Sequence, residues 1–195
     1  MENESSDSKA IMMNSRPIAI TLEVKNNLLK GNCMRILSFN VYKFNELSEE
    51  AQKKAHENYL NKDYFSYHWV DEGIKSIQAF AGAFGIGLKD WSISTYGHSF
   101  IHTNADRDAF RGIDFDKAIG MINSADDGYC VYYDMKEKFI ETMKDHGDMK
   151  NSFLEAIEAG LKSIKSDMEY QETFKYFKEM VEVNDYEFYD NGNLI

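Results

Sequence analysis

The chain has 195 residues, of which 43% are hydrophobic and 14% aromatic, a composition that indicates a globular protein and excludes an intrinsically disordered one. Its formal net charge is −11, from 33 acidic and 22 basic residues. This excess disfavours direct binding to DNA or RNA, because such binding depends on Lys and Arg displacing counterions from phosphates. A basic protein would instead be attracted.

Residues 1–33 are polar, show no sustained structural period and predict a flexible N-terminal extension. Within them only Ile18 to Val24 alternates enough to make a short strand. The extension is balanced in charge, so the acidic excess lies after Met34, and residues 34–195 are predicted to form a single domain. Cys33 and Cys130 lack paired or metal-ligand spacing, and no apolar run suits a signal or a membrane span, which predicts a cytoplasmic protein.

The first part of this domain predicts a strand followed by a helix. Apolar and polar residues alternate from Met34 to Lys43, and a turn follows at Asn45 to Leu47. Ser48 is placed to cap a helix that runs to about Leu60. That helix should bury three residues of one face, namely Ala51, Ala55 and Tyr59.

The middle of the chain predicts a helix, a hairpin and shorter elements. A stripe of Phe65, Trp69, Gly73, Ile77, Phe80 and Phe84 predicts a buried helix face over 64–84, ended by Gly85 in the left-handed conformation. Two strands, 86–95 and 98–103, should then be joined at Tyr96-Gly97. A short helix begins at Asp114 or Asp116 and runs to about Asn123, and 130–133 is a further strand candidate.

The last third is predicted to be helical. Met135 to Asp145 forms one helix, and apolar residues from Phe153 to Met168 at steps of three and four form the next. Thr173 offers an N-cap for a separate helix to about Asn184. The chain closes with a strand, an Asn191-Gly192 turn and a stub. These elements predict an α+β fold with a small, mainly antiparallel sheet covered by helices on one side.

The residues that could carry chemistry are interpreted as structural. His98 and His102 would lie about 13 Å apart along a strand, at about 3.3 Å per residue, which is too far to hold one metal ion. The pairs Asp114/Asp116 and Arg107/Arg111 fit helix capping and local ion pairs, and no Ser or Cys stands in a nucleophile motif. We therefore expect no cofactor, no metal and no enzymatic activity.

The acidic last third allows two interpretations. Its carboxylates could imitate a phosphate backbone, but basic residues alternate with them at helical spacing, for example Lys162 after Glu158. A solvated face braced by its own salt bridges is the favoured interpretation. The residues nominated to contact a partner are the acids and aromatics Glu169, Glu172, Glu179, Glu182, Tyr186, Phe188 and Tyr189.

Both ends of the chain resemble those of one small-protein family. YKFNELSEEAQKKAHENY, 42–59, resembles its start, Y-x-F-x-E-L-S-x-x-A-x-x-K-A-x-x-x-Y, and EYQETFKYFKEMVEVNDYEFYDNGNLI, 169–195, resembles its finish, N-x-Y-E-F-x-x-D/N-G. This family is common in bacteriophages, prophages and plasmids and is largely uncharacterised, and some members carry an antitoxin-like label. Members start shortly before the Y-x-F element, so Met34 resembles the family's ordinary start and residues 1–33 an addition.

The resemblance implies a setting rather than catalytic residues. Small acidic proteins of mobile elements often bind and inhibit a host defence protein, as anti-CRISPR proteins do, or neutralise a toxin. The leading hypothesis is therefore a non-enzymatic inhibitor of a CRISPR or other nuclease in the cytoplasm of a bacterial host. Its partner would be a basic, nucleic-acid-handling protein, without direct contact to nucleic acid or membrane. An antitoxin is the alternative, and an unrecognised enzyme is the third.

Overall fold

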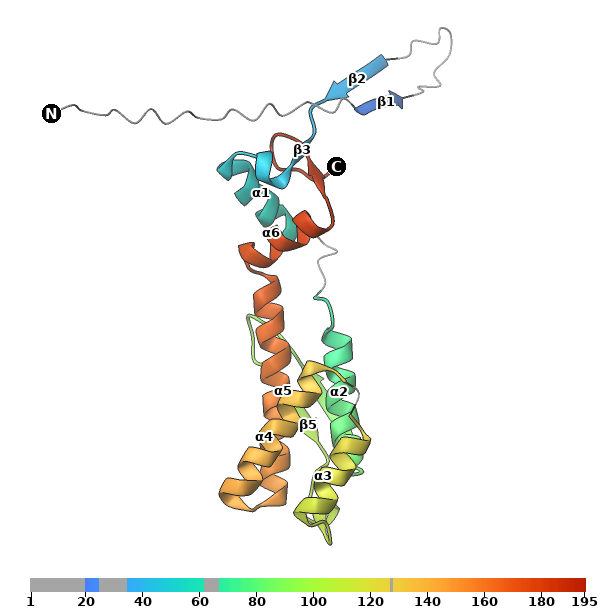
Figure 1. Cartoon of the computed structure of the whole chain (residues 1–195), viewed down its shortest axis with the longest axis vertical. Coiled ribbons are helices and arrows are strands. Elements are labelled where there is room, and N and C mark those ends of the chain that lie inside the picture. The colour runs from blue at the N-terminus through green and yellow to red at the C-terminus, as the bar shows by residue number, and fades with distance from the viewer. Residues whose placement is uncertain (1–19, 25–34, 62–66, 127) are drawn as a thin grey trace, which may run out of the picture. The chain divides into compact units, whose positions relative to one another are not determined.

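The computed structural model describes residues 20–24, 35–61, 67–126 and 128–195. The fold is α+β, with helices dominating and all strands short and antiparallel (Figure 1). Contacts divide the chain into two compact units. Unit 1 contains Met1–Asp63 and Phe177–Ile195, and unit 2 contains Tyr64–Tyr176.

Unit 1 is built from both ends of the chain. Its elements are β1 (Ile20–Val24), β2 (Arg35–Phe39), β3 (Tyr42–Lys43), the 3-10 helix η1 (Phe44–Glu46), α1 (Glu49–Leu60), most of α6 (Phe174–Val183) and β6 (Glu187–Phe188). β1 pairs with β2, and β3 pairs with β6. Strands more than a hundred residues apart in sequence are therefore neighbours in this unit.

Helix α1 begins as its sequence predicts. The Ser48 hydroxyl accepts a hydrogen bond from the Ala51 N–H at 3.2 Å, which satisfies one of the free donors of the first turn. Ala51 and Ala55 are buried, while Tyr59 is half-buried. They pack into a small core whose other members are Phe44, Leu47, Phe177, Val181 and Phe188.

The closing hairpin of unit 1 lies directly against α1. Phe188 bridges to Leu194 across the predicted Asn191-Gly192 turn, and Gly192 has φ of +82°. A Cβ atom on Gly192 would lie 2.2 Å from the Ala51 carbonyl oxygen. Only glycine permits this approach of the turn to the helix backbone.

Unit 2 is a helical assembly with one hairpin. Its elements are α2 (Val70–Ala83), β4 (Leu88–Ser92), β5 (Phe100–Thr103), the 3-10 helix η2 (Asp108–Phe110), α3 (Phe115–Ser124), α4 (Cys130–His146) and α5 (Met149–Gln171). α4 and α5 form an antiparallel pair joined at Gly147 and Asp148 (Figure 1). Gly147 ends α4 in the left-handed conformation, and Asp148 caps α5 by accepting a hydrogen bond from the Asn151 N–H.

Aromatic rings form the centre of unit 2. Phe80 has no exposed surface, and its ring centroid lies 5.7 to 6.2 Å from those of Tyr132, Phe139 and Phe153. The Tyr132 hydroxyl donates to the Ile122 carbonyl oxygen at 2.6 Å, so its burial leaves no polar atom unsatisfied. This core fixes α2, α3, α4 and α5 together.

Several predicted elements are confirmed. Asp114 caps α3 by accepting from the Lys117 N–H at 2.8 Å, and Thr173 accepts from the Tyr176 N–H at the start of α6. Gly85 follows α2 with φ of +69°. The two middle strands pair as an antiparallel hairpin, shorter than predicted. Among the described residues, the antiparallel strands are divided among three separate two-stranded pairs.

Two features differ from the sequence prediction. Residues 130–133, predicted as a strand, form the first turn of α4 instead. Trp69, predicted to be buried, precedes α2 in the left-handed conformation and is 67% exposed, because the helical period begins only at Val70. Within the 1–33 extension, the segment predicted to be able to form a short strand contains β1, Ile20–Val24. Tyr64 and Phe65, predicted to be helical, lie outside the described residues.

A chain beginning at Met34 should melt within about 2 °C of the full chain. Among the described strands β1 pairs only with β2, and an isolated two-stranded hairpin contributes little stability of its own. Thermal melts of both chains followed by circular dichroism measure this. Loss of a cooperative transition in the shorter chain would contradict it and would make β1 a necessary part of unit 1.

Candidate functional site

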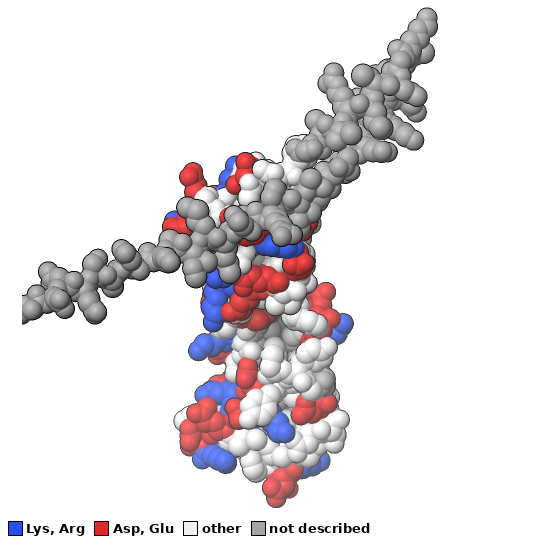
Figure 2. All heavy atoms as spheres, turned by 45° about the horizontal axis from the view of Figure 1, so that its top comes forward, with Lys and Arg blue, Asp and Glu red and all other residues white. Residues whose placement is uncertain are grey.

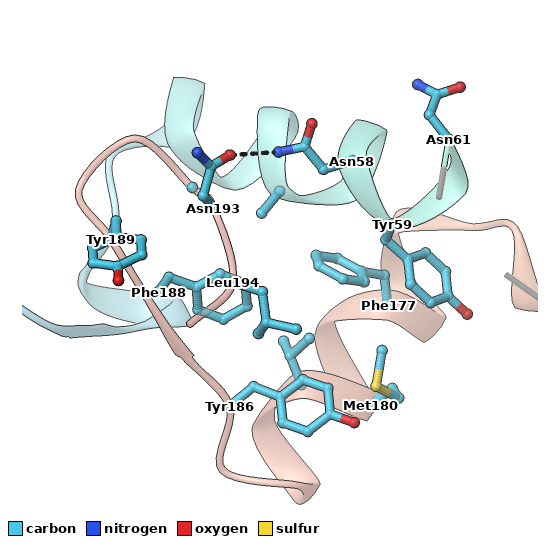
Figure 3. A pocket seen from close by; sticks show the side chains of 13 residues that line it. Asn58, Tyr59, Asn61, Phe177, Met180, Tyr186, Phe188, Tyr189, Asn193 and Leu194 are labelled. Atoms are coloured by element: carbon cyan, nitrogen blue, oxygen red, sulfur yellow. Dashed lines mark hydrogen bonds between the residues drawn. The ribbon is translucent and has the colours of Figure 1, made fainter. Parts of the chain in front are cut away.

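Unit 1 contains a pocket of about 530 Å³ between α1, α6 and the closing hairpin (Figure 3). This volume is within the range of about 300 to 1,000 Å³ that is typical of ligand sites. Most of its wall is apolar or aromatic, with contributions from Tyr59, Phe177, Met180, Tyr186, Phe188 and Leu194. Such a wall favours a large apolar group over an ion or a sugar.

Local contacts hold the wall of this pocket in place. The ring of Tyr59 on α1 lies 5.0 Å from that of Phe177 on α6. The Asn58 side chain donates to the Asn193 side-chain oxygen at 3.0 Å, which links α1 to the hairpin (Figure 3). The Tyr186 N–H donates to the Val181 carbonyl oxygen, so the chain turns back over α6 as soon as the helix ends.

A second, smaller hollow of about 230 Å³ adjoins the pocket. Val181 and Tyr186 belong to both walls. Apart from Phe44, the rest of the second hollow is lined by charged and polar residues, namely Lys43, Asn45, Glu182 and Asp185. Lys43 Nζ lies 2.9 Å from an Asp185 carboxylate oxygen and 3.1 Å from one of Glu187. The hydrogen bond to Asp185 raises the pKa of Lys43, and partial burial offsets some of this rise.

The nominated partner-binding residues are divided between the two units. Tyr186 is 39% exposed and lines the pocket together with Tyr189, whose ring also contacts Phe39 edge-on at 5.6 Å. Phe188 is only 2% exposed because its side chain belongs to the core of unit 1, so it is not an exposed anchor. Glu182, in the second hollow, lies 4.0 Å from Lys178.

The other three nominated acids lie away from this pocket's wall. Glu179 is on the exposed side of α6, and Glu169 on α5 pairs with Lys165 at 3.8 Å. On the face drawn in Figure 2, acidic and basic side chains are interspersed instead of forming rows of one sign. Within the last third, Lys165 pairs with Glu169 and Lys178 with Glu182, each four residues apart, as the solvated-face interpretation expects.

Glu172, at the end of α5, is the centre of a hydroxyl cluster in unit 2. Its carboxylate accepts hydrogen bonds from the hydroxyls of Tyr67, Thr95 (2.9 Å) and Tyr96 (3.0 Å). Burial opposes ionisation, but the three hydrogen bonds outweigh it, so the pKa of Glu172 is lowered. Burial and the bond to Glu172 raise the pKa of Tyr67. The cluster fastens the tip of the β4–β5 hairpin to α5.

Replacing Glu172 with glutamine should destabilise unit 2 by about 1 to 2 kcal/mol at neutral pH, because hydrogen bonds to a charged group are replaced by weaker ones. The folded pKa of Glu172 lies below that of an unfolded glutamate. Its contribution is therefore fully present above the unfolded value and is lost as the pH falls through the folded value.

Urea unfolding of the wild type and Glu172→Gln across this acidic range measures the effect. The two free energies of unfolding should converge as the pH falls. Glu169→Gln, on the same helix, is the control and should change stability by less than about 0.5 kcal/mol, because its ion pair is exposed. A pH-independent difference for Glu172→Gln would mean that the carboxylate's charge does not hold the cluster.

The residues weighed for catalysis and metal binding have structural surroundings. The Phe100 ring lies between His98 and His102, with centroids 6.1 and 4.7 Å away. Arg111 pairs with Asp108 at 3.1 Å. Cys130, interpreted as lying in an apolar strand, is an exposed residue at the start of α4. In the described ranges, no three His, Cys, Asp or Glu side chains are arranged to hold a metal ion.

No family model, curated protein or solved structure matches this chain. The resemblance of its two ends to a mobile-element family therefore stays a prediction. Within the described part of the chain, no helix is both long and apolar enough to cross a membrane.

Sequence reasoning found only part of the pocket. It nominated Tyr186 and Tyr189 as aromatics among acids, but it missed Asn58, Met180 and Leu194. What these three residues share in the sequence is that each lies in one of the two end segments that carry the family resemblance. Two segments that carry one resemblance and are far apart in sequence are candidates for contact in space.

Proposed function

We propose that this protein works by binding another protein and that it has no enzymatic role. The partner is a basic, nucleic-acid-handling protein of a bacterial host, such as a CRISPR or other nuclease. This protein is encoded by a phage or other mobile element and inhibits that partner. The observation that carries the proposal is the aromatic pocket of unit 1 beside a hollow that contains carboxylates. An apolar anchor site with acidic neighbours suits a basic protein surface.

Charge supports the same class of partner. Residues 177–195, which form one side of the pocket, contain five acidic residues and one basic residue, Lys178. With a net charge of −11 over the whole chain, the protein's field attracts basic surfaces and repels phosphate backbones. The mobile-element setting rests on the sequence resemblance described above.

The test is capture of partners from bacterial lysate by the full chain, followed by reconstitution with the purified partner. Association with a basic partner should slow as ionic strength rises, while dissociation changes less, since long-range attraction acts mainly on encounter. The captured protein should also lose its activity on nucleic acid when the chain is added. Capture of free DNA or RNA without protein would overturn the proposal, as would an association rate that ignores salt.

An antitoxin is the second candidate, and it makes a different prediction about gene neighbours. An antitoxin gene is usually paired with an adjacent toxin gene. Rescue of growth when the chain is co-expressed with its neighbour's product would favour the antitoxin. Inhibition of a host nuclease encoded elsewhere would favour the defence inhibitor.

A further inference from the structure

The pocket and the adjoining hollow of unit 1 differ in chemistry but share a wall. The larger is lined mainly by aromatic and aliphatic side chains. The smaller contains the carboxylates of Glu182 and Asp185 and the ammonium group of Lys43, so its lining has a net negative charge. Tyr186 and Val181 stand between them. An apolar site and a site of net negative charge therefore share a wall at Tyr186 and Val181.

We infer that these two hollows together bind one short segment of the partner protein. A large apolar side chain of that segment, such as Trp or Leu, enters the pocket, and a Lys or Arg one or two positions away enters the hollow. This inference rests on the protein-binding function proposed above. It specifies which face of the protein binds and what the bound segment must contain.

The apolar half of the site supplies a buried anchor. Phe177 and Phe188 form its floor as parts of the unit 1 core, while Leu194 and Tyr186 are partly exposed at its edge. A side chain seated there removes apolar surface from water on both partners, and such anchors dominate binding energy at protein interfaces.

The acidic half supplies selection for positive charge. The Asp185 side chain is 82% exposed even though Lys43 contacts it, and the Glu182 carboxylate lies 4.0 Å from the Lys178 ammonium group, at the limit for an ion pair. Both carboxylates can therefore accept hydrogen bonds from an incoming guanidinium or ammonium group. The adjacent Tyr186 ring can also face such a cation.

Other occupants fit these features less well. A nucleic acid would place phosphates against Glu182 and Asp185, and an uncharged small molecule would leave the acidic hollow unused. A second copy of this chain would bring net charges of −11 together. A basic segment with an apolar anchor uses both hollows.

The first experiment compares two synthetic probes on the full chain. N-acetyl-Trp-Gly-Arg-amide and N-acetyl-Trp-Gly-Glu-amide differ only in the third residue, which is cationic in the first and anionic in the second. Titration followed by the methyl NMR signals of Met180, Val181 and Leu194 reports occupancy of the pocket directly. The Arg probe should bind about fivefold more tightly at low salt, as expected for one partly exposed ion pair, and this ratio should shrink as salt is added.

Matched variants test the contributions of the apolar pocket and the acidic hollow separately. The double variant Glu182→Gln with Asp185→Asn should bring the ratio of the two probes close to one and leave binding of the Trp group intact. Asparagine also tolerates the positive φ of 55° at position 185. Tyr186→Ala should weaken both probes about tenfold, as truncation of an aromatic anchor does. Tyr129→Ala, at 42% exposure in unit 2, should bind like the wild type.

The outcomes separate this inference from the proposed function. Equal binding of the two probes to the wild type would overturn the inference in favour of an uncharged ligand. Probe-induced shifts of signals outside the pocket and the hollow would show that the segment binds at another place on the protein. Loss of the methyl signals on self-association would favour a second copy. If Tyr186→Ala and the double variant capture the reconstituted partner as well as the wild type, the inference fails while the protein-binding function stands. If the wild type captures no protein, the proposed function fails.

Discussion

Gly192→Ala should destabilise unit 1 by about 3 kcal/mol or more. The new Cβ would lie 2.2 Å from the Ala51 carbonyl oxygen and 3.2 Å from the Ala55 nitrogen, both of which are backbone atoms of α1. The turn would have to move away from the helix, and alanine is also strained at φ of +82°. Overpacking costs about 1 to 3 kcal/mol, and the left-handed conformation adds about 1 to 2 kcal/mol.

Hydrogen exchange by mass spectrometry can locate this loss. Amides of α1 should exchange faster in Gly192→Ala. Both tryptophans, Trp69 and Trp91, lie in unit 2, so their fluorescence follows that unit during unfolding.

Gly147→Ala is the matched control for Gly192→Ala. Gly147 also has positive φ, +65°, but its Cβ would meet no atom within 4 Å. Gly147→Ala should therefore destabilise unit 2, and by only about 1 to 2 kcal/mol, which is the conformational strain alone. If the two variants lose equal stability, the hairpin does not pack against α1 as the structure describes.

Local sequence signals predicted the elements whose ends are fixed by their own residues. Ser48, Asp114 and Thr173 each accept a backbone hydrogen bond in the first turn of a helix. Gly85 and Gly192 both adopt positive φ where a helix ends or a hairpin turns. Such interactions involve residues three or four apart, so the sequence pattern alone contains the information.

The beginning of α4 depends on contacts that no local pattern contains. Cys130, Val131 and the two tyrosines that follow have the β-branched and aromatic character of a strand. They are helical because Val131, Tyr132 and Met135 belong to the face of α4 that packs into the unit 2 core. Tertiary packing here outweighs intrinsic preference, which is worth only tenths of a kcal/mol per residue.

The candidate site was only partly predictable for the same reason. Tyr186 was nominated from its position among acids, and it does line the pocket. Phe188, two residues later, was nominated on the same grounds but is buried, because β6 pairs with β3 from the other end of the chain. The pocket itself exists only once α1 and the closing hairpin meet, which requires contacts over more than a hundred residues.

Phe80→Ala should destabilise unit 2 by about 3 to 5 kcal/mol, the largest loss expected here from removal of one side chain. Phe80 is fully buried, and its ring contacts those of Phe84, Tyr132, Phe139 and Phe153. Truncation leaves a cavity that four rings line and that the rigid α4–α5 pair cannot close. Urea unfolding followed by tryptophan fluorescence measures the loss.

Phe174→Ala, at 37% exposure, removes the same atoms from a site open to solvent and should cost about 1 kcal/mol or less. Comparable losses for the two variants would contradict a close-packed centre at Phe80.

The exchange of α1 amides in Phe80→Ala also tests the prediction that residues 34–195 form a single domain. If the chain unfolds in one step, the amides of α1 and α5 that exchange through global unfolding should lose equal protection, because they open by the same reaction. If α1 keeps its protection while α5 loses it, the two cores unfold separately and the one-domain prediction is wrong.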